Sequence, residues 1–310
     1  MHSVASSGGE LTPEQLAADA RAAGLDFIVS TEHNRTDTYE LWTPHAGDDL
    51  LVILGQEVTT RTGHWLALGL DPGHVIGGGQ APSIDGTIHS HHLRDVRAAG
   101  GLCVAAHPHA PYAGGTLQYP FHGFDLVEVW NGLWSSALPW NADNEAALAD
   151  WSRSLADGVS RGTWRPAIGN SDVHLAGQLG TPYTNVLAED LSEQAILAGL
   201  RAGRSWITES HGIDLSFTAS SGDDRSADIG ERLDTAGEVV DVVVTVRQGV
   251  PHGIVSIHAD AGEVHRDVLH DDGAGIVTWR TRADESSFLR VEMRHPDGVM
   301  AALTNPIIVA

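Results

Sequence analysis

Helical segments alternate with short apolar runs over the first 210 of the 310 residues, and few folds accommodate that order. The helices are expected at 12–23, 90–99, 144–155 and 191–202. The apolar runs, interpreted as buried strands, lie at 26–30, 50–54, 64–70, 102–106, 126–130 and 166–169. Strands that alternate with helices pair in parallel, so the pattern predicts an α/β architecture.

The pattern changes after about residue 210, where strands follow one another without a convincing helix. These strands are expected at 239–246, 254–259, 276–280 and 288–294. Residues 220–228, which are rich in Ser, Asp and Gly, are expected to form a loop. The sequence therefore predicts two domains, an α/β domain over 1–210 and a small, sandwich-like all-β module over 211–310.

The charge of the chain excludes one large class of partner. Acidic residues number 41 against 18 basic ones, and the net charge is −23. A protein that binds a phosphate backbone needs a basic face, so we expect no nucleic-acid partner. The single cysteine, Cys103, excludes a disulfide framework and a cysteine-based zinc site.

No segment of the sequence indicates insertion into a membrane. No run approaches the ~18 apolar residues of a spanning helix, so we expect no membrane partner. The opening residues, Met1-His2-Ser3, are not followed by the basic and apolar regions of a signal peptide. The sequence as written predicts a cytoplasmic protein, and export would require that the native N-terminus extends upstream.

Histidine is unusually frequent, with 18 residues, and several histidines and carboxylates fall at the ends of predicted strands. Ligand sites of α/β barrels lie at the C-terminal ends of the strands. Imidazole and carboxylate together suit Zn, Mn or Fe better than Ca or Mg. A carboxylate among several imidazoles can bridge two metals, which activate a water for attack on an ester. The polar set consists of His2, His33, Glu57, His64, His107, Asp172 and His174.

The segments around this set carry a family resemblance. They are Met1-His2-Ser3, Thr31-Glu32-His33-Asn34, Gly55-Gln56-Glu57, Gly63-His64, Ala106-His107-Pro108, Glu128-Val129-Trp130-Asn131, Ser171-Asp172-Val173-His174, Gly203-Arg204-Ser205 and Thr304-Asn305-Pro306-Ile307. In these segments the chain resembles the PHP-domain (polymerase and histidinol phosphatase) metallohydrolases, and most of all the CehA/McbA branch, named for a carbaryl-type ester hydrolase. The resemblance spans nearly the whole chain. It implies a distorted (β/α)7 barrel with a metal cluster at its mouth.

The resemblance also implies a role for each member of the set. Glu57 would bridge two divalent transition metal ions, Zn, Mn or Fe. The other ligands divide into His64 and His107 for one ion, and His2 and Asp172 for the other. His33 and His174 match positions that bind a third ion in trinuclear members, or that contact substrate and move protons in others. Both are therefore catalytic candidates as well as metal-ligand candidates.

Three positions depart from the family pattern. The family motif is His-x-His, and Met1 stands in its middle position. We therefore expect that the true start lies upstream, with the first His and a first β-strand, and that the barrel as written is open. Ser7 stands where trinuclear members often carry Asp, which leaves the third ion open. Glu32 replaces the commoner Asp before His33 and is expected to orient a ligand.

Three further residues are candidates for contact with substrate. Asn131 either bonds to substrate or to a ligand, or caps the end of its strand. Arg35 either holds an anionic group or lies free on the surface. Arg204 either binds phosphate or forms a salt bridge. His89, His91 and His92 are expected to lie on the surface without a metal, and the histidines after residue 210 show no metal-ligand spacing.

These features together predict a metal-dependent hydrolase of small esters. Phosphoesters are the first candidate substrates, ahead of carboxyl and carbamate esters. A metal-activated hydroxide would be the nucleophile, and His33 or His174 would protonate the leaving group. The alternative is a binding protein with a degraded metal site, whose β module mediates recognition. Buried imidazoles and carboxylates are costly without a metal, which favours the enzyme.

Overall fold

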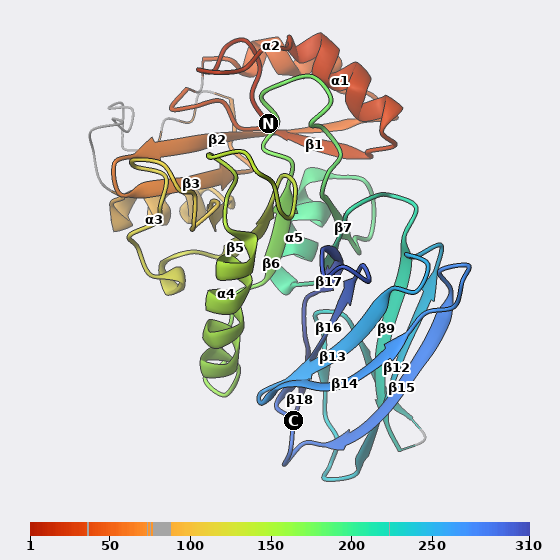
Figure 1. Cartoon of the computed structure of the whole chain (residues 1–310). Helices are drawn as coiled ribbons and strands as arrows, with labels where there is room; N and C mark the ends of the chain where they lie inside the picture. The colour runs from red at the N-terminus through yellow and green to blue at the C-terminus, as the bar shows by residue number, and fades with distance from the viewer. Residues whose placement is uncertain (36, 73, 75, 77–87, 223) are drawn as a thin grey trace.

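A curled, six-stranded sheet in the order β1-β2-β3-β4-β5-β6 carries the first part of the chain (Figure 1). The computed structural model describes residues 1–35, 37–72, 74, 76, 88–222 and 224–310. The strands are β1 (Phe27–Ser30), β2 (Leu51–Thr60), β3 (Gly63–Leu68), β4 (Leu102–Ala105), β5 (Leu126–Asn131) and β6 (Ala167–Asn170). β1 pairs in parallel with β2, and β4, β5 and β6 pair in parallel with one another.

The predicted parallel pairing is wrong for one strand. β3 is antiparallel to both of its neighbours, β2 and β4. Only Arg61 and Thr62 separate β2 from β3, and a parallel connection needs a dozen or more residues, so these two strands can only form a hairpin. Gly63 closes the turn at a φ of 122°. The complete (β/α)7 barrel is not confirmed, because the structure shows a half-barrel of six strands.

All four predicted helices are confirmed, with ends that differ by a few residues. The helices are α1 (Pro13–Ala22), α2 (Tyr39–Trp42), α3 (Ser90–Ala98), α4 (Asn144–Val159) and α5 (Glu193–Ala202), with short 3-10 turns η1 (Thr43–His45) and η2 (Phe121–Gly123). Thr12 and Gln15 form a reciprocal capping box at the start of α1. Ser192 caps α5, and Gly203 ends it in a left-handed conformation. No helix among the described residues is long and apolar enough to span a membrane.

Helices cover both faces of the curled sheet, so its strands are buried on both sides. Alternate residues of β4 show the division: Cys103 and Ala105 join the core beneath α1 and α3, whereas Leu102 and Val104 join the core beneath α5. α4 packs against β5 through Trp151, which shares a core with Val127. The face that packs on α5 is the inner face of the curl, and it continues toward the polar ends of the strands.

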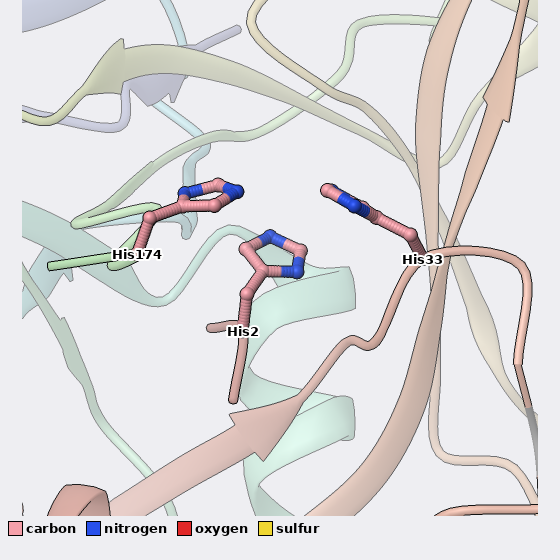
Figure 2. Close-up of side chains that lie close together, drawn as sticks. All are labelled: His2, His33 and His174. Atoms are coloured by element: carbon pink, nitrogen blue, oxygen red, sulfur yellow. The ribbon is translucent and has the colours of Figure 1, made fainter. Parts of the chain in front are cut away.

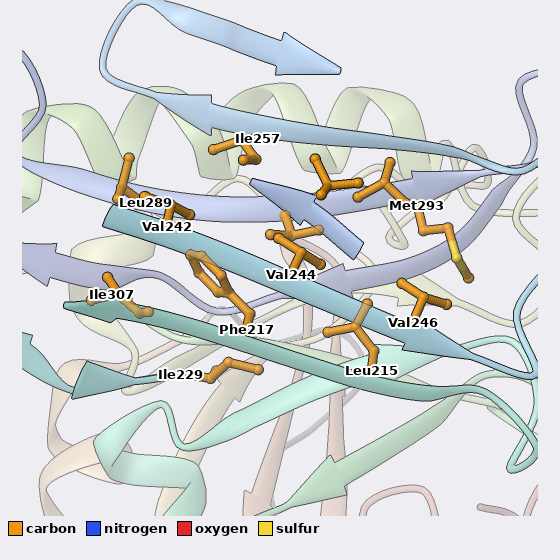
Figure 3. Close-up of a cluster of buried hydrophobic side chains, with 14 of the residues drawn as sticks. Leu215, Phe217, Ile229, Val242, Val244, Val246, Ile257, Leu289, Met293 and Ile307 are labelled. Atoms are coloured by element: carbon orange, nitrogen blue, oxygen red, sulfur yellow. The ribbon is translucent and has the colours of Figure 1, made fainter. Parts of the chain in front are cut away.

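The remaining strands form two further sheets. One has the order β10-β9-β12-β15, and the other has the order β11-β18-β16-β17-β8-β7, with β13 paired to β16 and β14 to β13. The strands are β7 (Tyr183–Val186), β8 (Ser205–Thr208), β9 (Asp214–Ser221), β10 (Arg225–Asp228), β11 (Arg232–Leu233), β12 (Val239–Arg247), β13 (Ile254–Ala259), β14 (Gly262–Val268), β15 (Gly275–Arg282), β16 (Phe288–Arg294), β17 (Met300–Thr304) and β18 (Ile307–Val309). Side chains from both sheets fill one apolar core, as Figure 3 shows for Phe217, Val244 and Met293.

The loop predicted at 220–228 is wrong in part. β9 runs to Ser221, and β10 covers Arg225–Asp228, so most of this segment is an antiparallel hairpin. Its polar composition concealed the alternation, in which Ala219, Ser221 and Ala227 are buried while their neighbours face outward. The boundary at 210 stays a prediction, since β8 from before it pairs with β17 from after it.

At the outer edge of β6, side chains rather than another strand form hydrogen bonds with the main-chain N–H and C=O groups. The main-chain N–H of Ala167 donates to Oδ1 of Asn305 at 2.7 Å, and the amide of Asn305 donates to the carbonyl of Ala167 at 3.0 Å and to that of Ser205 at 3.0 Å. The hydroxyl of Thr184 bonds both to the N–H and to the carbonyl of Gly169. The second sheet is therefore fastened to the strand that leads into Asp172.

Candidate metal centre

The two-residue period of the strands places Glu57 and His64 on the inner face of the curl. Ile53 and Leu66 belong to the core beneath α5. Glu57 lies four residues after Ile53 and His64 two before Leu66, so all four side chains share a face. In the hairpin, Glu57 pairs with Leu66 and is two positions from the residue that pairs with His64. The polar end of the hairpin thus presents a carboxylate and an imidazole together.

Three other ligand candidates follow the strands that run in parallel. His33 comes three residues after β1, His107 two residues after β4, and Asp172 two residues after β6. Both His107 and Asp172 have positive φ angles, 23° and 46°, which L-residues rarely adopt. Strain of this kind is concentrated at functional sites, where the surrounding structure holds a side chain in a required direction.

Glu57 lies at the centre of four imidazoles. Its Oε2 is 3.0 Å from Nε2 of His2 and 3.7 Å from Nε2 of His33. Its Oε1 is 2.8 Å from Nδ1 of His64 and 3.3 Å from Nε2 of His107. The two oxygens therefore face two separate groups of histidines. One carboxylate placed in this way can contact two cations at once.

The structure brings together all seven residues of the predicted set. They form three overlapping groups with potential ligand atoms within 4.8 Å of one another: His2, His33 and His174; Glu57, His64 and His107; and His2, Glu57 and Asp172. Figure 2 shows the three rings of the first group facing one another. The ring of His2 is 4.2 Å from that of His33 and 4.4 Å from that of His174, measured between centroids.

The hydrogen bonds of His174 leave one of its nitrogens free for a cation. Nδ1 of His174 lies 2.9 Å from the main-chain oxygen of Asp172, which can only accept, so Nδ1 carries the proton and Nε2 is left as a ligand. Nδ1 of His2 and Nδ1 of His107 are buried without a hydrogen-bond partner among the described residues. The Nε2 atoms of the same two rings lie 3.0 and 3.3 Å from the carboxylate oxygens of Glu57, and a set of imidazoles and carboxylates of this kind fits a divalent metal of the Zn, Mn or Fe type.

The pKa values describe the charges that this cluster carries without a metal. Burial lowers the pKa of His33 to about 4, so this ring is neutral at pH 7. Burial acts in the same direction on His107, but the hydrogen bond and charge of Glu57 outweigh it and raise the pKa of His107 to about 10. Burial opposes the charge of Glu57 and Asp172, yet the surrounding imidazoles hold the pKa of both carboxyls well below its usual range. Both carboxyls are therefore ionised at pH 7, as the carboxylate ligands of a metal must be.

Glu32 holds the N-terminal segment in place rather than touching a histidine ring. Its carboxylate accepts hydrogen bonds from the main chain and hydroxyl of Ser3, from the hydroxyl of Ser6 and from Nε1 of Trp42. The hydroxyl of Ser6 in turn accepts from the main-chain N–H of His33 at 2.9 Å. One buried carboxylate thus positions the segments that carry His2 and His33.

Glu128 was not among the predicted site residues. It is buried, and its Oε2 accepts from the main-chain N–H of His107 at 2.6 Å. Its Oε1 accepts from the amides of Asn131 at 3.1 Å and Asn170 at 3.0 Å. The sequence does contain a signal, because Glu128 is a lone carboxylate inside an apolar strand, where an unpaired charge is costly.

The three predicted substrate residues lie in different places. Asn131 joins the cluster, with its amide 3.2 Å from Oδ2 of Asp172. Arg35 lies beside the N-terminal segment, where its guanidinium bonds to Asp37 and to the carbonyl of Ala5. Arg204 is not joined to the cluster by any contact among the described residues. It precedes β8, and its main chain lies against Gly230.

A cavity of about 630 Å³ lies next to the centre. It reaches from Glu57 and Asp172 toward β1, β6, β7 and α5.

A second group of histidines lies apart from the centre, at the start of α3. The rings of His89, His91 and His92 are 4.1 to 5.5 Å apart. His92 is buried, which corrects the expected surface position for that residue.

Comparison with known proteins gives a family match in sequence and several similar solved structures. Residues 152–205, which include Asp172 and His174, match the family model described as PHP-associated (PHP_C). A protein from Bifidobacterium adolescentis assigned as a metal-dependent phosphoesterase is 19% identical, over 64% of this chain and 93% of its own, with a TM-score of 0.42. An amidohydrolase from Chromobacterium violaceum, solved with sulfate and no metal, is 18% identical, over 57% and 87%, with a TM-score of 0.39. Both scores are too low to define a shared fold. No curated protein matches the chain significantly.

Proposed function

We propose that this chain is a metal-dependent hydrolase of small esters, related to the PHP metallohydrolases and to their CehA/McbA branch. The observation that carries the proposal is the position of Glu57, with one oxygen toward His2 and the other toward His64. The PHP-associated match supports it over the segment that holds Asp172. Two divalent ions are proposed, and a third where His33 and His174 meet His2.

Each residue has a definite part in this proposal. Glu57 would hold both ions, together with His64 and His107 at one position and with His2 and Asp172 at the other. When bound, the metals supply Lewis acidity and lower the pKa of water, so that a nucleophile forms near neutral pH. Burial lowers the pKa of His33 to about 4, so this ring would act as a neutral imidazole that accepts a proton or holds the third ion, rather than as the acid that protonates the leaving group.

Phosphoesters are the first candidate substrates. Paired cations on either side of Glu57 offset the charge of a phosphoester at the reacting atom, which is the common use of such pairs. The substrate is proposed to be small, since a chain with a net charge of −23 repels a polyanion.

Carboxyl or carbamate esters are the second candidate, and a specific observation favours them. Although Arg35 follows His33 and bonds to the carbonyl of Ala5, four of the segments that carry or follow ligand candidates, 1–12, 106–120, 131–143 and 171–182, contain no Arg or Lys. Exposed apolar side chains stand there instead: Val4, Tyr112, Leu133, Leu138, Trp140 and Leu175. The ring of Tyr112 is 6.0 Å from that of His64. Such a rim suits a neutral substrate with an apolar leaving group.

The test is hydrolysis of a panel by protein supplied with Zn, Mn or Fe. The panel comprises p-nitrophenyl phosphate, bis-p-nitrophenyl phosphate, p-nitrophenyl acetate and an aryl carbamate. Asp172→Ala and His107→Ala should abolish hydrolysis, while His252→Asn, at an exposed histidine of the β-strand region, should leave it unchanged. Binding of metal without hydrolysis of any ester would favour the alternative, a binding protein with a degraded site.

A further inference from the structure

Three charged residues of β16 lie in a row against α4, with Arg290 and Glu292 buried and Arg294 partly exposed. Arg290, Glu292 and Arg294 alternate along the strand, so their side chains share a face. Glu292 accepts from Arg290 at 2.7 Å through Oε1 and from Arg294 at 3.0 Å through Oε2. Arg290 also donates to the hydroxyl of Ser152 on α4 at 3.0 Å, and its guanidinium lies over the ring of Trp151. The C-terminal strand β16 thus contacts α4 along one side.

Arg294 carries this contact to the first turn of α4. Its guanidinium bonds to both carboxylate oxygens of Glu145, at 2.5 and 3.2 Å. The same carboxylate accepts from Nε1 of Trp134 at 2.8 Å, and the guanidinium of Arg294 lies over the ring of Trp134 at 5.5 Å. Arg294 therefore fixes both the start of α4 and the segment that follows β5.

Asn144, which precedes Glu145, is buried. Its side chain bonds to main-chain atoms of the segment that follows β5. Its Oδ1 accepts from the N–H of Asn131 at 2.9 Å. Its amide lies within hydrogen-bond distance of the carbonyls of Asn131 at 3.2 Å, Leu133 at 3.0 Å and Trp134 at 3.1 Å. One buried side chain that serves three residues of one loop leaves that loop little freedom.

The chain of contacts ends at a proposed metal ligand. The side-chain amide of Asn131 lies 3.2 Å from Oδ2 of Asp172 and 3.1 Å from Oε1 of Glu128. Glu128 accepts from the main-chain N–H of His107. The orientation of Asn131 therefore bears on one ligand candidate directly and on another through Glu128.

We infer that the C-terminal strands help to set the metal site, with Arg294 and Asn144 as positioning residues for Asp172. Arg294 holds Glu145 and Trp134, Asn144 holds the main chain of Asn131, and Asn131 orients the carboxylate of Asp172. Neither Arg294 nor Asn144 touches a metal ligand. The inference rests on the proposed function only in taking Asp172 as a ligand.

The test is a titration of each full-length variant with Zn²⁺ against a chromophoric chelator, together with thermal unfolding. Asn144→Asp keeps the acceptor and the size of the side chain but removes the donors, and should weaken one Zn²⁺ site by on the order of 10–100-fold. Arg294→Gln should weaken the same site by a smaller factor, and Arg294→Lys should recover part of that loss. Arg280→Gln, which breaks an exposed ion pair with Asp241, is the matched control and should bind Zn²⁺ as the wild type does.

Folded variants with lower melting temperatures and wild-type Zn²⁺ affinity would overturn the inference, because they would show packing without positioning. A failure of the proposed function would appear elsewhere, in a wild type that binds Zn²⁺ yet hydrolyses no ester. A wild type that binds no Zn²⁺ would overturn both proposals, and the wild-type titration alone would reveal it.

Discussion

Oε2 of Glu57 lies 3.0 Å from Nε2 of His2, a residue 55 positions away in the sequence. Both side chains are buried. The sheet creates this approach: the N–H of His2 bonds to the carbonyl of Val173 beyond β6, while Glu57 stands on β2 near the opposite edge. The two ends of the curl therefore meet at the carboxylate, and the site depends on the whole sheet.

Replacement of the central carboxylate should affect every proposed metal position. In Glu57→Gln the size of the side chain is kept, but the negative charge between the two histidine groups is lost. Metal content should fall, and ester hydrolysis should fall by more than the 10–100-fold that loss of an outer partner costs. Elemental analysis and initial rates measure the two effects. Glu285→Gln, at an exposed carboxylate, is the control; equal metal content in both variants would refute the bridging role.

Metal uptake at pH 7 should release protons. The pKa of His107 is raised to about 10 in the absence of metal, despite its burial, because Glu57 accepts its hydrogen bond. The pKa of His2 is raised as well, through Asp172 and Glu57, against the effect of burial. A metal must displace these protons to reach the nitrogens. Calorimetric titration in buffers of different ionisation enthalpy counts them, and a heat that is independent of buffer would contradict this arrangement.

Acid stability should depend on a histidine outside the metal site. Burial lowers the pKa of His258 to about 4, from an ordinary value near 6.5. As the pH falls below about 6.5, the unfolded chain takes up a proton at His258 that the folded chain does not. The contribution of this histidine to the free energy of unfolding is therefore fully present above about pH 6.5 and is lost toward pH 4. His258→Asn should remove on the order of 2 kcal/mol of this loss.

The free energy of unfolding from urea titrations at pH 7 and pH 4.5 measures this effect. The difference between the two pH values should shrink in His258→Asn and stay as in the wild type in His252→Asn, whose side chain is exposed. An unchanged difference in His258→Asn would show that other groups cause the acid loss.

Residues added before Met1 should fill the cavity beside β1. The N–H of Thr31 bonds to the carbonyl of Met1 at 3.2 Å, and the amino group of Met1 lies 3.5 Å from the carbonyl of Val29, as in a parallel ladder. β1 has one strand neighbour in the described sheet, and the cavity lies along its other side. Four added β-branched residues should pair there and raise the melting temperature by several degrees, since each buried apolar side chain contributes about 1.5–3 kcal/mol.

An extension of the same length made of Gly and Ser is the matched control for the cavity. It removes the charge of the buried amino group from the same position but offers no apolar side chains. Equal melting temperatures for the two extended proteins would show that the cavity does not accept a strand.

The sequence predicted the grouping of the seven polar side chains better than the pairing of the strands. His33, Glu57 and His107 were identifiable because each follows or ends an apolar run, and such ends meet at one edge of a sheet. The hairpin of β2 and β3 was missed because its polar residues interrupt the apolar pattern that marks a strand. The position of Arg204 depends on long-range packing against Gly230, which no local pattern encodes, and its role in binding phosphate or forming a salt bridge stays a prediction.

The contacts that orient the proposed ligands also could not be predicted from the sequence. Asn144 and Arg294 act through loops and a strand that are far apart in the chain, and each residue type has many ordinary uses in proteins. Their roles emerge only from the hydrogen bonds to Asn131 and Glu145. Spacing in the sequence reveals ligands at strand ends, whereas their supports depend on the complete fold.

Elemental analysis of metal per chain tests the central claim most directly. The protein is purified without chelator and without a histidine tag, so that the metal found belongs to the chain. Glu57 between two histidine groups predicts two or more transition metal ions per chain, and fewer in Glu57→Gln. One ion or none in the wild type, in the presence of Zn, Mn and Fe, would contradict a bridged metal centre.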